Sequence, residues 1–203
     1  MIDASRPLLL GSASPRRREI VATLGIPCVV AAVDVDETPA AGEAPGAYLA
    51  RIVRAKLTAA LGLELAAAAG ACLVADTSVI LDAEILGKPT TPADAARMIR
   101  ALSGRAHEVH TRFAIGQASS PGAPLHEETV VSRVVFRALT DGEIEGYVAT
   151  GEGADKAGAY AVQGIGAFAV QRIEGSYGAV VGLPACEVVL ALRDLGLLGA
   201  FPR

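Results

Sequence analysis

The sequence contains no tryptophan and few other aromatic residues, with only four phenylalanines and four tyrosines among 203 residues. Hydrophobic residues nevertheless make up 52% of the chain, so its interior must be built mainly from alanine, valine, leucine and isoleucine. A core of this composition suits β-strands that are covered by helices. At this length the chain fits one domain, or one elongated domain with two lobes, and it can bury a core without disulfides or metals.

Cysteine is equally scarce, and long hydrophobic runs are missing. Cys28, Cys72 and Cys186 are odd in number, far apart and each set in an apolar run, which predicts buried, reduced thiols in a reducing compartment. No early segment combines a basic start, an apolar stretch and a small-residue cleavage site. The apolar run over residues 65–75 is shorter than the roughly 20 helical residues that cross a bilayer. We therefore expect a soluble, cytoplasmic protein with no secretion signal and no membrane partner.

An excess of positive charge is absent as well, because the formal net charge is −4. A protein that covers nucleic acid usually carries a basic surface, so we expect no nucleic-acid partner. Any anion that the chain binds should be small and held locally. Three catalytic patterns are also missing: the glycine-rich Walker loop, the Gly-x-Ser-x-Gly of serine hydrolases, and cysteines at zinc-ligand spacing.

Hydrophobic periodicity and turn residues divide the chain into strands and helices. Strands are expected at 7–12, 27–33, 71–75, 79–81, 108–116, 129–137, 159–162, 167–173 and 179–181. Helices are expected at 16–24, 47–61, 92–102, 140–150 and 184–195. The turn at 119–124 carries proline and glycine, which predicts a β-hairpin between its flanking strands. No repeat and no clean domain boundary are visible.

The first candidate for chemistry lies where the first strand gives way to the first helix. Ser14 suits the N-cap and Pro15 the first helical position, and the free N–H groups of such a helix start attract an anion. The hydroxyls of Ser12 and Ser14 and the guanidinium groups of Arg16 and Arg17 stand beside it and could hold a phosphate chain. The alternative is a well-capped surface helix with solvated arginines.

Acidic residues at predicted loop or strand ends form the second candidate: Asp34, Asp36, Glu37 and Asp76. Hard cations such as Mg²⁺ take carboxylate oxygens and keep several waters, so this set could hold a metal that bridges substrate phosphates. A carboxylate could instead activate the attacking water. Asp76 is placed at the end of an apolar strand, where open α/β folds bind ligands. The alternatives are a solvated loop for Asp34 and Asp36, and a turn or cap carboxylate for Asp76.

Two lysines complete the candidates. Lys56 falls on the inward face of the helix at 47–61, yet lysine is almost never fully buried unless it is paired. It could face a polar cavity, or lay its stem along apolar surface and free its ammonium group. Lys88 lies in a stiff Gly-Lys-Pro turn that could aim the ammonium at a phosphate. His107 and His110 are three residues apart in a predicted strand, which puts them on opposite faces and favours structural or surface roles over metal binding.

Short motifs of small, charged and turn-forming residues follow one another along nearly the whole chain. They are 9–17, Asp36-Glu37, Lys56, Ala75-Asp76-Thr77, Gly87-Lys88-Pro89, Ser103-Gly104 with His107, Val109 and Thr111, then 156–160, Gln163-Gly164, Gly175-Ser176-Tyr177 and 181–184. Any one of them is common, but the ordered set is specific. On this set the chain resembles the Maf family of nucleoside triphosphate pyrophosphatases, small cytoplasmic enzymes that are also linked to septum formation.

The resemblance implies an α/β fold over residues 1–203. It would be an elongated, two-lobed single domain with a long mixed β-sheet flanked by helices, of the architecture of inosine triphosphate pyrophosphatases. The implied activity is that of a hydrolase that cuts a nucleoside triphosphate between the α and β phosphates. The products would be a monophosphate and pyrophosphate. Gly11 and Ala185 stand at places that vary in the family.

The resemblance also implies roles for particular residues. Asp76 matches the proton acceptor that activates water against the α-phosphorus. Ser12, Arg17, Lys56 and Lys88 match positions that hold the triphosphate or steady its charge. Glu37 matches an acidic position, which together with Asp76 implies a divalent metal such as Mg²⁺, Mn²⁺ or Co²⁺.

Three positions indicate the substrate. Arg16, Thr77 and Gln163 match the subgroup that acts on dTTP and UTP, whereas the subgroup for 7-methyl-GTP tends to carry tryptophan, serine and glutamate there. An amide such as that of Gln163 can donate and accept at once, which suits uracil or thymine. We therefore expect a house-cleaning dTTP/UTP pyrophosphatase, with modified pyrimidine nucleotides as further substrates and a homodimer as its assembly. The alternatives are a non-catalytic, nucleotide-binding regulator of septum formation and a 7-methyl-GTP pyrophosphatase.

Overall fold

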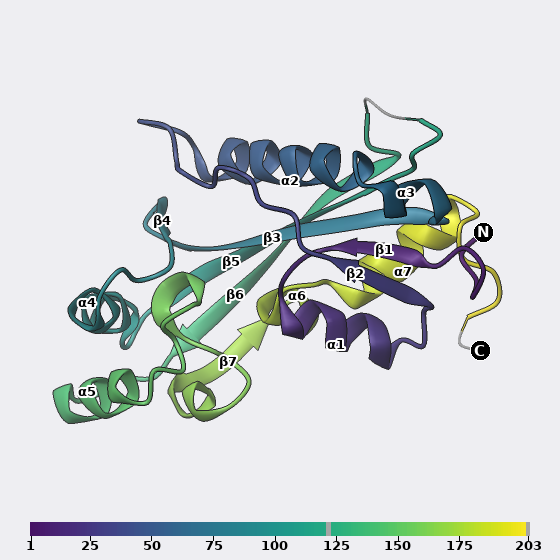
Figure 1. Cartoon of the computed structure of the whole chain (residues 1–203). Coiled ribbons are helices and arrows are strands. Elements are labelled where there is room, and N and C mark those ends of the chain that lie inside the picture. The colour runs from purple at the N-terminus through teal and green to yellow at the C-terminus, as the bar shows by residue number, and fades with distance from the viewer. Residues whose placement is uncertain (121–122, 202–203) are drawn as a thin grey trace. The chain divides into compact units, whose positions relative to one another are not determined.

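The computed structural model describes residues 1–120 and 123–201, which form an α/β protein (Figure 1). The strands are β1 (Leu8–Gly11), β2 (Cys28–Ala31), β3 (Ala71–Leu81), β4 (Glu84–Leu86), β5 (Ala106–Gly116), β6 (His126–Phe136) and β7 (Val170–Glu174). The helices are α1 (Pro15–Thr23), α2 (Pro45–Leu61), α3 (Glu64–Ala68), α4 (Pro92–Leu102), α5 (Asp141–Ala149), α6 (Tyr177–Val181) and α7 (Ala185–Asp194), with short 3-10 helices η1 (Ala157–Ala159) and η2 (Ile165–Ala169).

The strands form one mixed sheet of seven strands, in the order β2-β1-β3-β5-β6-β7 with β4 paired to β3. β1 runs parallel to β2 and β3, whereas the β3–β4 and β6–β7 pairs are antiparallel. The predicted α/β class with a mixed sheet flanked by helices is therefore confirmed. β5 and β6 are neighbours in the sheet, as the hairpin prediction requires, but the predicted turn includes residues 121–122, which lie outside the described residues.

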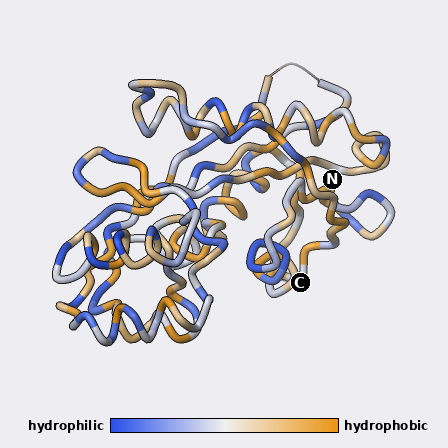
Figure 2. The backbone as a smooth tube through the Cα atoms, turned by 60° about the vertical axis from the view of Figure 1, so that its left-hand side comes forward, coloured by the Kyte–Doolittle hydropathy of each residue, from blue (hydrophilic) through white to orange (hydrophobic). Residues whose placement is uncertain are grey.

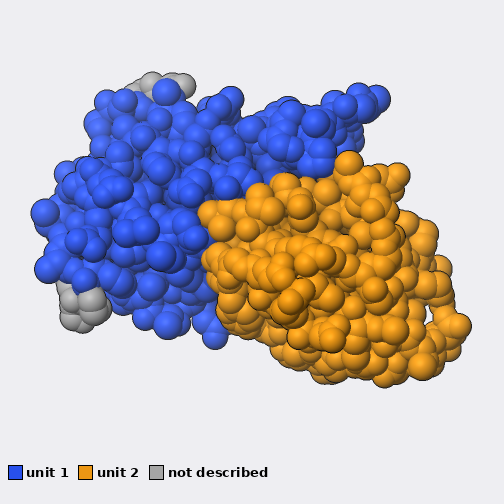
Figure 3. All heavy atoms as spheres, turned by 180° about the vertical axis from the view of Figure 1, so that it is seen from behind, with its two compact units in different colours: residues 1–76, 111–129, 182–203 blue, residues 77–110, 130–181 orange. Residues whose placement is uncertain are grey.

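The chain forms two compact units, coloured separately in Figure 3. Unit 1 comprises residues 1–76, 111–129 and 182–203, and unit 2 comprises residues 77–110 and 130–181. Strands β3, β5 and β6 each begin in one unit and end in the other. Because the chain passes between the units several times, no single cut separates them, which is why no boundary is visible in the sequence. The single domain over 1–203 and its elongated form stay predictions.

Unit 1 is built on strands β1 and β3, which are buried on both faces. All four residues of β1 are buried, as in parallel strands covered on either side. Leu9 packs with Cys72 and Val74 against Val53 and Leu57 of helix α2. Figure 1 shows α1 on the other side of these strands. Helix α2 is thereby fixed on the sheet through one apolar face.

Unit 2 has a hydrophobic core of its own. The parts of β3, β5 and β6 that belong to unit 2 pack there with helices α4 and α5 and with η1, through residues such as Ile99, Phe136 and Tyr147. Helix α4 has the bounds expected from the sequence, and the Thr91 side chain caps it by accepting from Asp94 N–H. Helix α5 begins with a capping box formed by Thr140 and Glu143.

Strand β3 corrects the predicted place of Asp76. The sequence suggested a strand at 71–75, a break at Asp76-Thr77 and a second strand at 79–81, whereas the structure has one strand from Ala71 to Leu81. Asp76 therefore lies inside a strand and not at its end. The polar pair made the hydrophobic run look interrupted, but the strand continues because Val79 to Leu81 pair with the short strand β4, which the sequence did not predict.

Three other predictions of local structure are corrected. The segment 159–162 is not a strand, and residues 179–181 belong to helix α6. Both segments are apolar but too short for periodicity to separate strand from helix. Helix α2 begins at Pro45, two residues before the predicted start. Helix α3 was not predicted.

The cysteines are all free, but they are not all buried. Cys72 is buried, Cys28 is partly buried, and Cys186 is exposed on helix α7, which corrects the expectation of three buried thiols. Figure 2 shows hydrophilic residues interspersed with hydrophobic ones along the helices. Among residues 1–120 and 123–201, no helix combines the length and the apolar character needed to span a membrane.

Candidate functional site

The turn from strand β1 into helix α1 brings Ser12 and Arg17 together. Ser12 is only 5% exposed, and its hydroxyl oxygen accepts hydrogen bonds from Ser14 N–H at 3.2 Å and from Arg17 Nη1 at 3.3 Å. Arg17 Nε donates to the Gly182 carbonyl at 2.8 Å. The guanidinium group is therefore held over the start of α1 by a side chain and by a distant backbone segment.

Ser14 and Arg16 flank this pair without joining it. Ser14 is the N-cap residue and Pro15 the first residue of α1, as predicted, but the Ser14 side chain makes no capping hydrogen bond. Among the described residues, neither the Ser14 hydroxyl nor the Arg16 guanidinium has a hydrogen-bond or ion-pair partner. Both residues are partly buried. Their polar groups are thus placed at the helix start and are available to a ligand.

Lys56 is the centre of the most distinctive cluster. It is buried, as its helical phase predicted, and its Nζ lies 2.7 Å from Asp76 Oδ1 and 2.5 Å from Glu37 Oε1. Helix α2 supplies the lysine, strand β3 the aspartate, and the segment after β2 the glutamate. A buried ammonium is tolerated when carboxylates pair with it. Of the two interpretations of Lys56, the structure supports the lysine that faces polar partners.

Arg17 belongs to the same electrostatic environment. Burial lowers the pKa of the Arg17 guanidinium, and the positive charge of Arg16 acts in the same direction, whereas the negative charges of Asp76 and Glu37 oppose the shift. The Arg17 guanidinium therefore interacts electrostatically with both carboxylates that contact Lys56. Unit 1 alone thus gathers two cations and two anions, together with the Ser12 hydroxyl.

Tyr48 is a member of this cluster that the sequence analysis missed. Its hydroxyl donates to the Glu37 carbonyl at 3.0 Å. Burial, followed by the negative charges of Asp76 and Glu37, raises the pKa of Tyr48 to about 12. Tyr48 and Lys56 are eight residues apart on helix α2, so they share a face. That spacing was the available signal.

The acidic residues that precede Glu37 take no part. Asp34 and Asp36 are exposed, and Asp36 Oδ1 accepts from Thr38 N–H at 2.9 Å. Hydrogen bonds from Thr38 hold the pKa of the Asp36 carboxyl below its usual range. For Asp34 and Asp36, the structure agrees with the alternative of a solvated acidic loop.

Thr77, Lys88 and Gln163 lie in unit 2. Thr77 follows Asp76 in strand β3 and is partly buried, whereas Lys88 and Gln163 are exposed. The Gly-Lys-Pro turn of Lys88 is tied to η1, because Gly158 N–H donates to the Gly87 carbonyl at 3.1 Å. That these three residues act with the Lys56 cluster stays a prediction.

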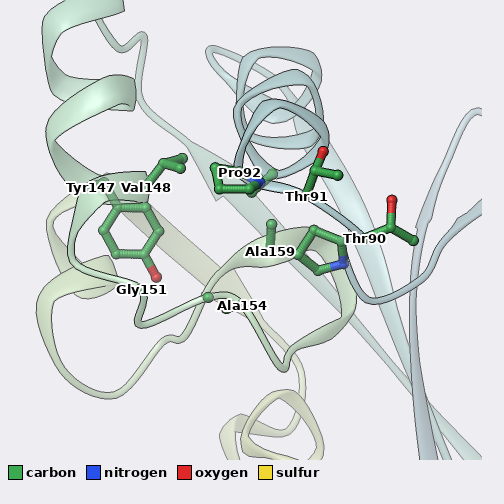
Figure 4. Close-up of a pocket in the computed structure, with 11 residues that line it drawn as sticks. Thr90, Thr91, Pro92, Tyr147, Val148, Gly151, Ala154 and Ala159 are labelled. Carbon is green, nitrogen blue, oxygen red and sulfur yellow. The ribbon is translucent and has the colours of Figure 1, made fainter.

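Unit 2 also contains a pocket of about 250 Å³. Figure 4 shows Tyr147 and Val148 of helix α5, Thr90 to Pro92 at the start of α4, and Ala159 around it. Among the described residues, none of the predicted site residues lines this pocket. Asp94, in the first turn of α4, accepts one hydrogen bond from Thr90 N–H at 3.1 Å, so a negative charge already lies at this helix start.

The fit of a divalent metal can be tested on the Lys56 cluster. Glu37 and Asp76 each place a carboxylate oxygen against the Lys56 ammonium, so the two carboxylates lie close together. The described residues contain no group of three or more histidine, cysteine or acidic side chains that could hold a metal by themselves. Mg²⁺ is often held by one or two carboxylates, with water and substrate phosphates as its other ligands. The two carboxylates fit such a site.

The comparison with protein families agrees with the sequence motifs. A family model described as "Maf-like protein" matches residues 7–195. This span contains every predicted site residue.

Similar curated proteins cover nearly the whole chain. The "dTTP/UTP pyrophosphatase" of Geobacter sulfurreducens is 49% identical over 192 residues, covering 94% of this chain and 97% of that protein. The protein of the same name from Myxococcus xanthus is also 49% identical, covering 94% and 93%. That of Geotalea uraniireducens is 46% identical over 200 residues, covering 98% and 100%.

Among solved structures, the chain resembles a HAM1 protein from Coxiella burnetii only distantly. The TM-score is 0.43 at 18% sequence identity, with 64% of this chain and 73% of that chain covered. The architecture of inosine triphosphate pyrophosphatases stays a prediction. The family model and the long, highly identical matches rest on the whole chain, and on them the protein belongs to the Maf-like family.

Proposed function

We propose that this chain is a nucleoside triphosphate pyrophosphatase that hydrolyses dTTP and UTP to the monophosphate and pyrophosphate. The observation that carries the proposal is the contact of Asp76 with the buried Lys56 ammonium, which Glu37 contacts as well. The curated relatives at 46% and 49% identity bear the name of this activity. Their names support the pyrimidine substrates over 7-methyl-GTP.

Asp76 is the group that activates water in this proposal. Lys56 contacts only one carboxylate oxygen of Asp76, Oδ1, so Oδ2 can accept a hydrogen bond from a water molecule. As the water oxygen forms a bond to the α-phosphorus, its proton passes to Asp76. The bond from the α-phosphorus to the bridging oxygen breaks, and pyrophosphate leaves with that oxygen.

The cationic groups bind and steady the phosphates. Ser12 and Arg17 are already held against each other at the start of α1, where helix N–H groups favour an anion. Lys56 and Lys88 supply further positive charge for the triphosphate. Groups that are fixed before the substrate arrives need little reorganisation as charge develops, which favours the transition state.

Glu37 and Asp76 would hold a divalent metal together with water and substrate phosphates. When bound, Mg²⁺, Mn²⁺ or Co²⁺ would supply positive charge that neutralises the phosphate oxygens. In this arrangement, the Lys56 ammonium keeps the two carboxylates oriented toward one place.

Base selection is assigned to Arg16, Thr77 and Gln163. The exposed amide of Gln163 can offer a donor and an acceptor, which matches the carbonyl and N–H of uracil or thymine. Modified pyrimidine nucleotides carry the same groups and are included among the proposed substrates, which suits a house-cleaning role.

The proposal is tested with an Asp76→Asn variant. Asparagine keeps the shape of the side chain but cannot take the proton, so we expect kcat to fall by about 10² to 10⁴. Pyrophosphate and free phosphate are assayed separately with each common and several modified nucleoside triphosphates, with Mg²⁺ or Mn²⁺. Asp34→Asn, at an exposed carboxylate on the loop before Glu37, serves as the matched control and should keep full activity.

Other outcomes would favour the alternatives. Free phosphate as the product, or full turnover by Asp76→Asn, would refute the proposed reaction. Nucleotide binding without turnover in the wild-type protein would favour the regulator of septum formation. A preference for 7-methyl-GTP would move the chain to the other substrate subgroup.

The assembly and location form the remaining part of the proposal. A homodimer and a cytoplasmic location are expected from the family resemblance, and the absence of a nucleic-acid partner from the net charge of −4. Light scattering of the purified protein during size exclusion measures the first of these directly. A monomer at all concentrations would contradict the dimer without affecting the proposed reaction.

A further inference from the structure

Two side chains from outside the segment that carries Gln163 hold its backbone through hydrogen bonds. Tyr147, on helix α5, accepts a hydrogen bond from Ala161 N–H at 3.1 Å. The Glu152 carboxylate accepts from Ile165 N–H at 2.8 Å and from Gly166 N–H at 2.7 Å. The two anchored ends leave Gln163 between them.

The two anchoring side chains also bind each other. The Tyr147 hydroxyl donates to Glu152 Oε2 at 2.9 Å, so the carboxylate accepts three hydrogen bonds in all. Burial works against ionisation of Glu152, but hydrogen bonds from Gly166 and Ile165 outweigh it and lower the pKa of the carboxyl. Three donors directed at one ionised carboxylate make strong, charge-assisted hydrogen bonds. We call Tyr147 and Glu152 the 147–152 clamp.

The loop backbone lies so close to the clamp that two positions need glycine. Gly164 has φ +95°, and a Cβ there would lie 2.2 Å from Glu152 Oε1. A Cβ at Gly166 would lie 2.3 Å from the Ala161 carbonyl oxygen and 2.7 Å from the Tyr147 hydroxyl oxygen. The glycines that follow Gln163 therefore leave the space that the Glu152 carboxylate and the Tyr147 hydroxyl occupy.

The clamp is itself rigidly supported. Tyr147 is 4% exposed in the core of unit 2, and its ring lies 5.8 Å from that of Phe168 in η2. Figure 4 shows the Tyr147 ring at the wall of the pocket beside Val148. Thr150 donates to the Tyr147 carbonyl at 2.6 Å, and Lys156 Nζ donates to the Glu152 carbonyl at 2.6 Å.

Gln163 itself shows the opposite character. Its side chain is exposed and makes no hydrogen bond to the residues that the structure describes. A backbone anchored on both sides of an unengaged amide is the arrangement needed to present that amide to a ligand at low entropic cost.

We propose that Glu152 and Tyr147 are positioning residues that hold the Gln163 amide for a pyrimidine base, so that base selection depends on the clamp. The inference rests on the proposed function, because it needs Gln163 to contact the base. Neither clamp residue touches the reacting phosphates in this proposal. Loosening the clamp therefore weakens base selection while leaving the chemical step intact.

The test measures selectivity in Glu152→Gln and Tyr147→Phe. We expect kcat/KM for UTP relative to GTP to fall on the order of 10- to 100-fold, because small misplacement of a positioning group has effects of this size. The loss should lie in KM for UTP and not in kcat. Glu145→Gln, the same change at an exposed position of helix α5, is the matched control and should keep the wild-type ratio.

Two further measurements separate positioning from general damage. In a Glu152→Gln/Gln163→Ala double variant, we expect no further loss of selectivity beyond that of Gln163→Ala, because both changes act through one amide. Amide hydrogen exchange at residues 161–169 should accelerate in Glu152→Gln while the rest of unit 2 stays protected. Additive losses, or wild-type selectivity in both clamp variants, would overturn the inference.

The outcomes distinguish this inference from the proposed function. If the wild-type protein hydrolyses UTP and the clamp variants keep its selectivity, only the inference fails. If the wild-type protein turns over no nucleoside triphosphate, the proposed function fails and the inference fails with it, whatever the exchange data show.

Discussion

At the scale of single residues, Lys56 shows how a buried charge is accommodated. The desolvation of an ammonium group is costly, and it is offset only when partners have good geometry. Lys56 has two carboxylate partners within 2.7 Å, from segments that lie before and after helix α2 in sequence. The Arg17 guanidinium and the Ser12 hydroxyl add to the same polar cluster. The cluster therefore connects helix α2 to the segments that carry Glu37 and Asp76, and it is also the centre of the proposed chemistry.

His107 is a second buried polar residue with a different consequence. It is 3% exposed, its Nε2 lies 2.8 Å from the Tyr160 hydroxyl oxygen, and its ring meets Phe136 edge-on. Its Nδ1 has no partner among the described residues. Burial lowers the pKa of His107 from 6.5 to about 4. The structural role expected from the sequence fits this environment.

We predict a loss of stability in acid that depends on His107. Below pH 6.5 the unfolded chain takes up a proton that the native state resists until about pH 4, so the free energy of unfolding falls across that window and levels off below it. The contribution is on the order of 3 kcal/mol. Urea unfolding at several pH values should give a shallower pH dependence for His107→Gln than for the wild type.

An unchanged slope between pH 6.5 and 4 in His107→Gln would show that other groups cause the acid sensitivity.

At the scale of elements, the seating of helix α2 on the sheet is the critical contact in unit 1. Gly11 ends strand β1, and a Cβ at this position would lie 2.8 Å from Val74 Cγ1 and 3.0 Å from Ala60 Cβ. Val74 and Ala60 are fully buried, so neither can move freely. The family resemblance treated Gly11 as a variable position, yet here a side chain would push α2 away from β1 and β3.

We predict that Gly11→Ala lowers the free energy of unfolding by about 1 to 3 kcal/mol, the usual cost of overpacking a core. Displacement of α2 should also move Lys56 relative to Asp76 and reduce kcat. Gly46→Ala, near the start of the same helix, meets no atom within 4 Å and should be neutral or slightly stabilising. Denaturant unfolding of both variants measures the difference. Equal stability of the two would contradict the close packing at Gly11.

The elements also show which signals in the sequence are sufficient. Helices α4 and α5 were predicted with nearly the observed bounds, and in the structure local caps at Thr91 and Thr140 mark their starts. Strand β3 was split in the prediction because Asp76-Thr77 interrupts its apolar pattern. Its continuity depends on neighbouring strands, which local periodicity does not reveal.

At the scale of the whole molecule, the two units have separate cores but share three strands. Strands β3, β5 and β6 each belong to both units, and they are consecutive neighbours in the sheet. Neither unit is one continuous piece of chain. Folding of either unit alone would leave these strands without part of their pairing.

We therefore predict a single cooperative unfolding transition for both units. Hydrogen exchange followed by mass spectrometry at increasing urea should give the same midpoint for peptides of unit 1 and unit 2. The change Gly11→Ala, which lies in unit 1, should lower both midpoints together. A midpoint that falls in unit 1 alone would show that the units unfold independently.

The sequence by itself determined the family, the helices with local caps, and the inward face of Lys56, because these depend on ordered motifs and on spacing along a few turns. The tertiary structure decided which groups these side chains contact. Lys56 meets Asp76 twenty residues away, Tyr48 reaches the backbone of Glu37, and Glu152 closes the loop of Gln163. Such contacts depend on which strands and helices pack together, and hydrophobic periodicity records only that a residue faces inward, not what it will face.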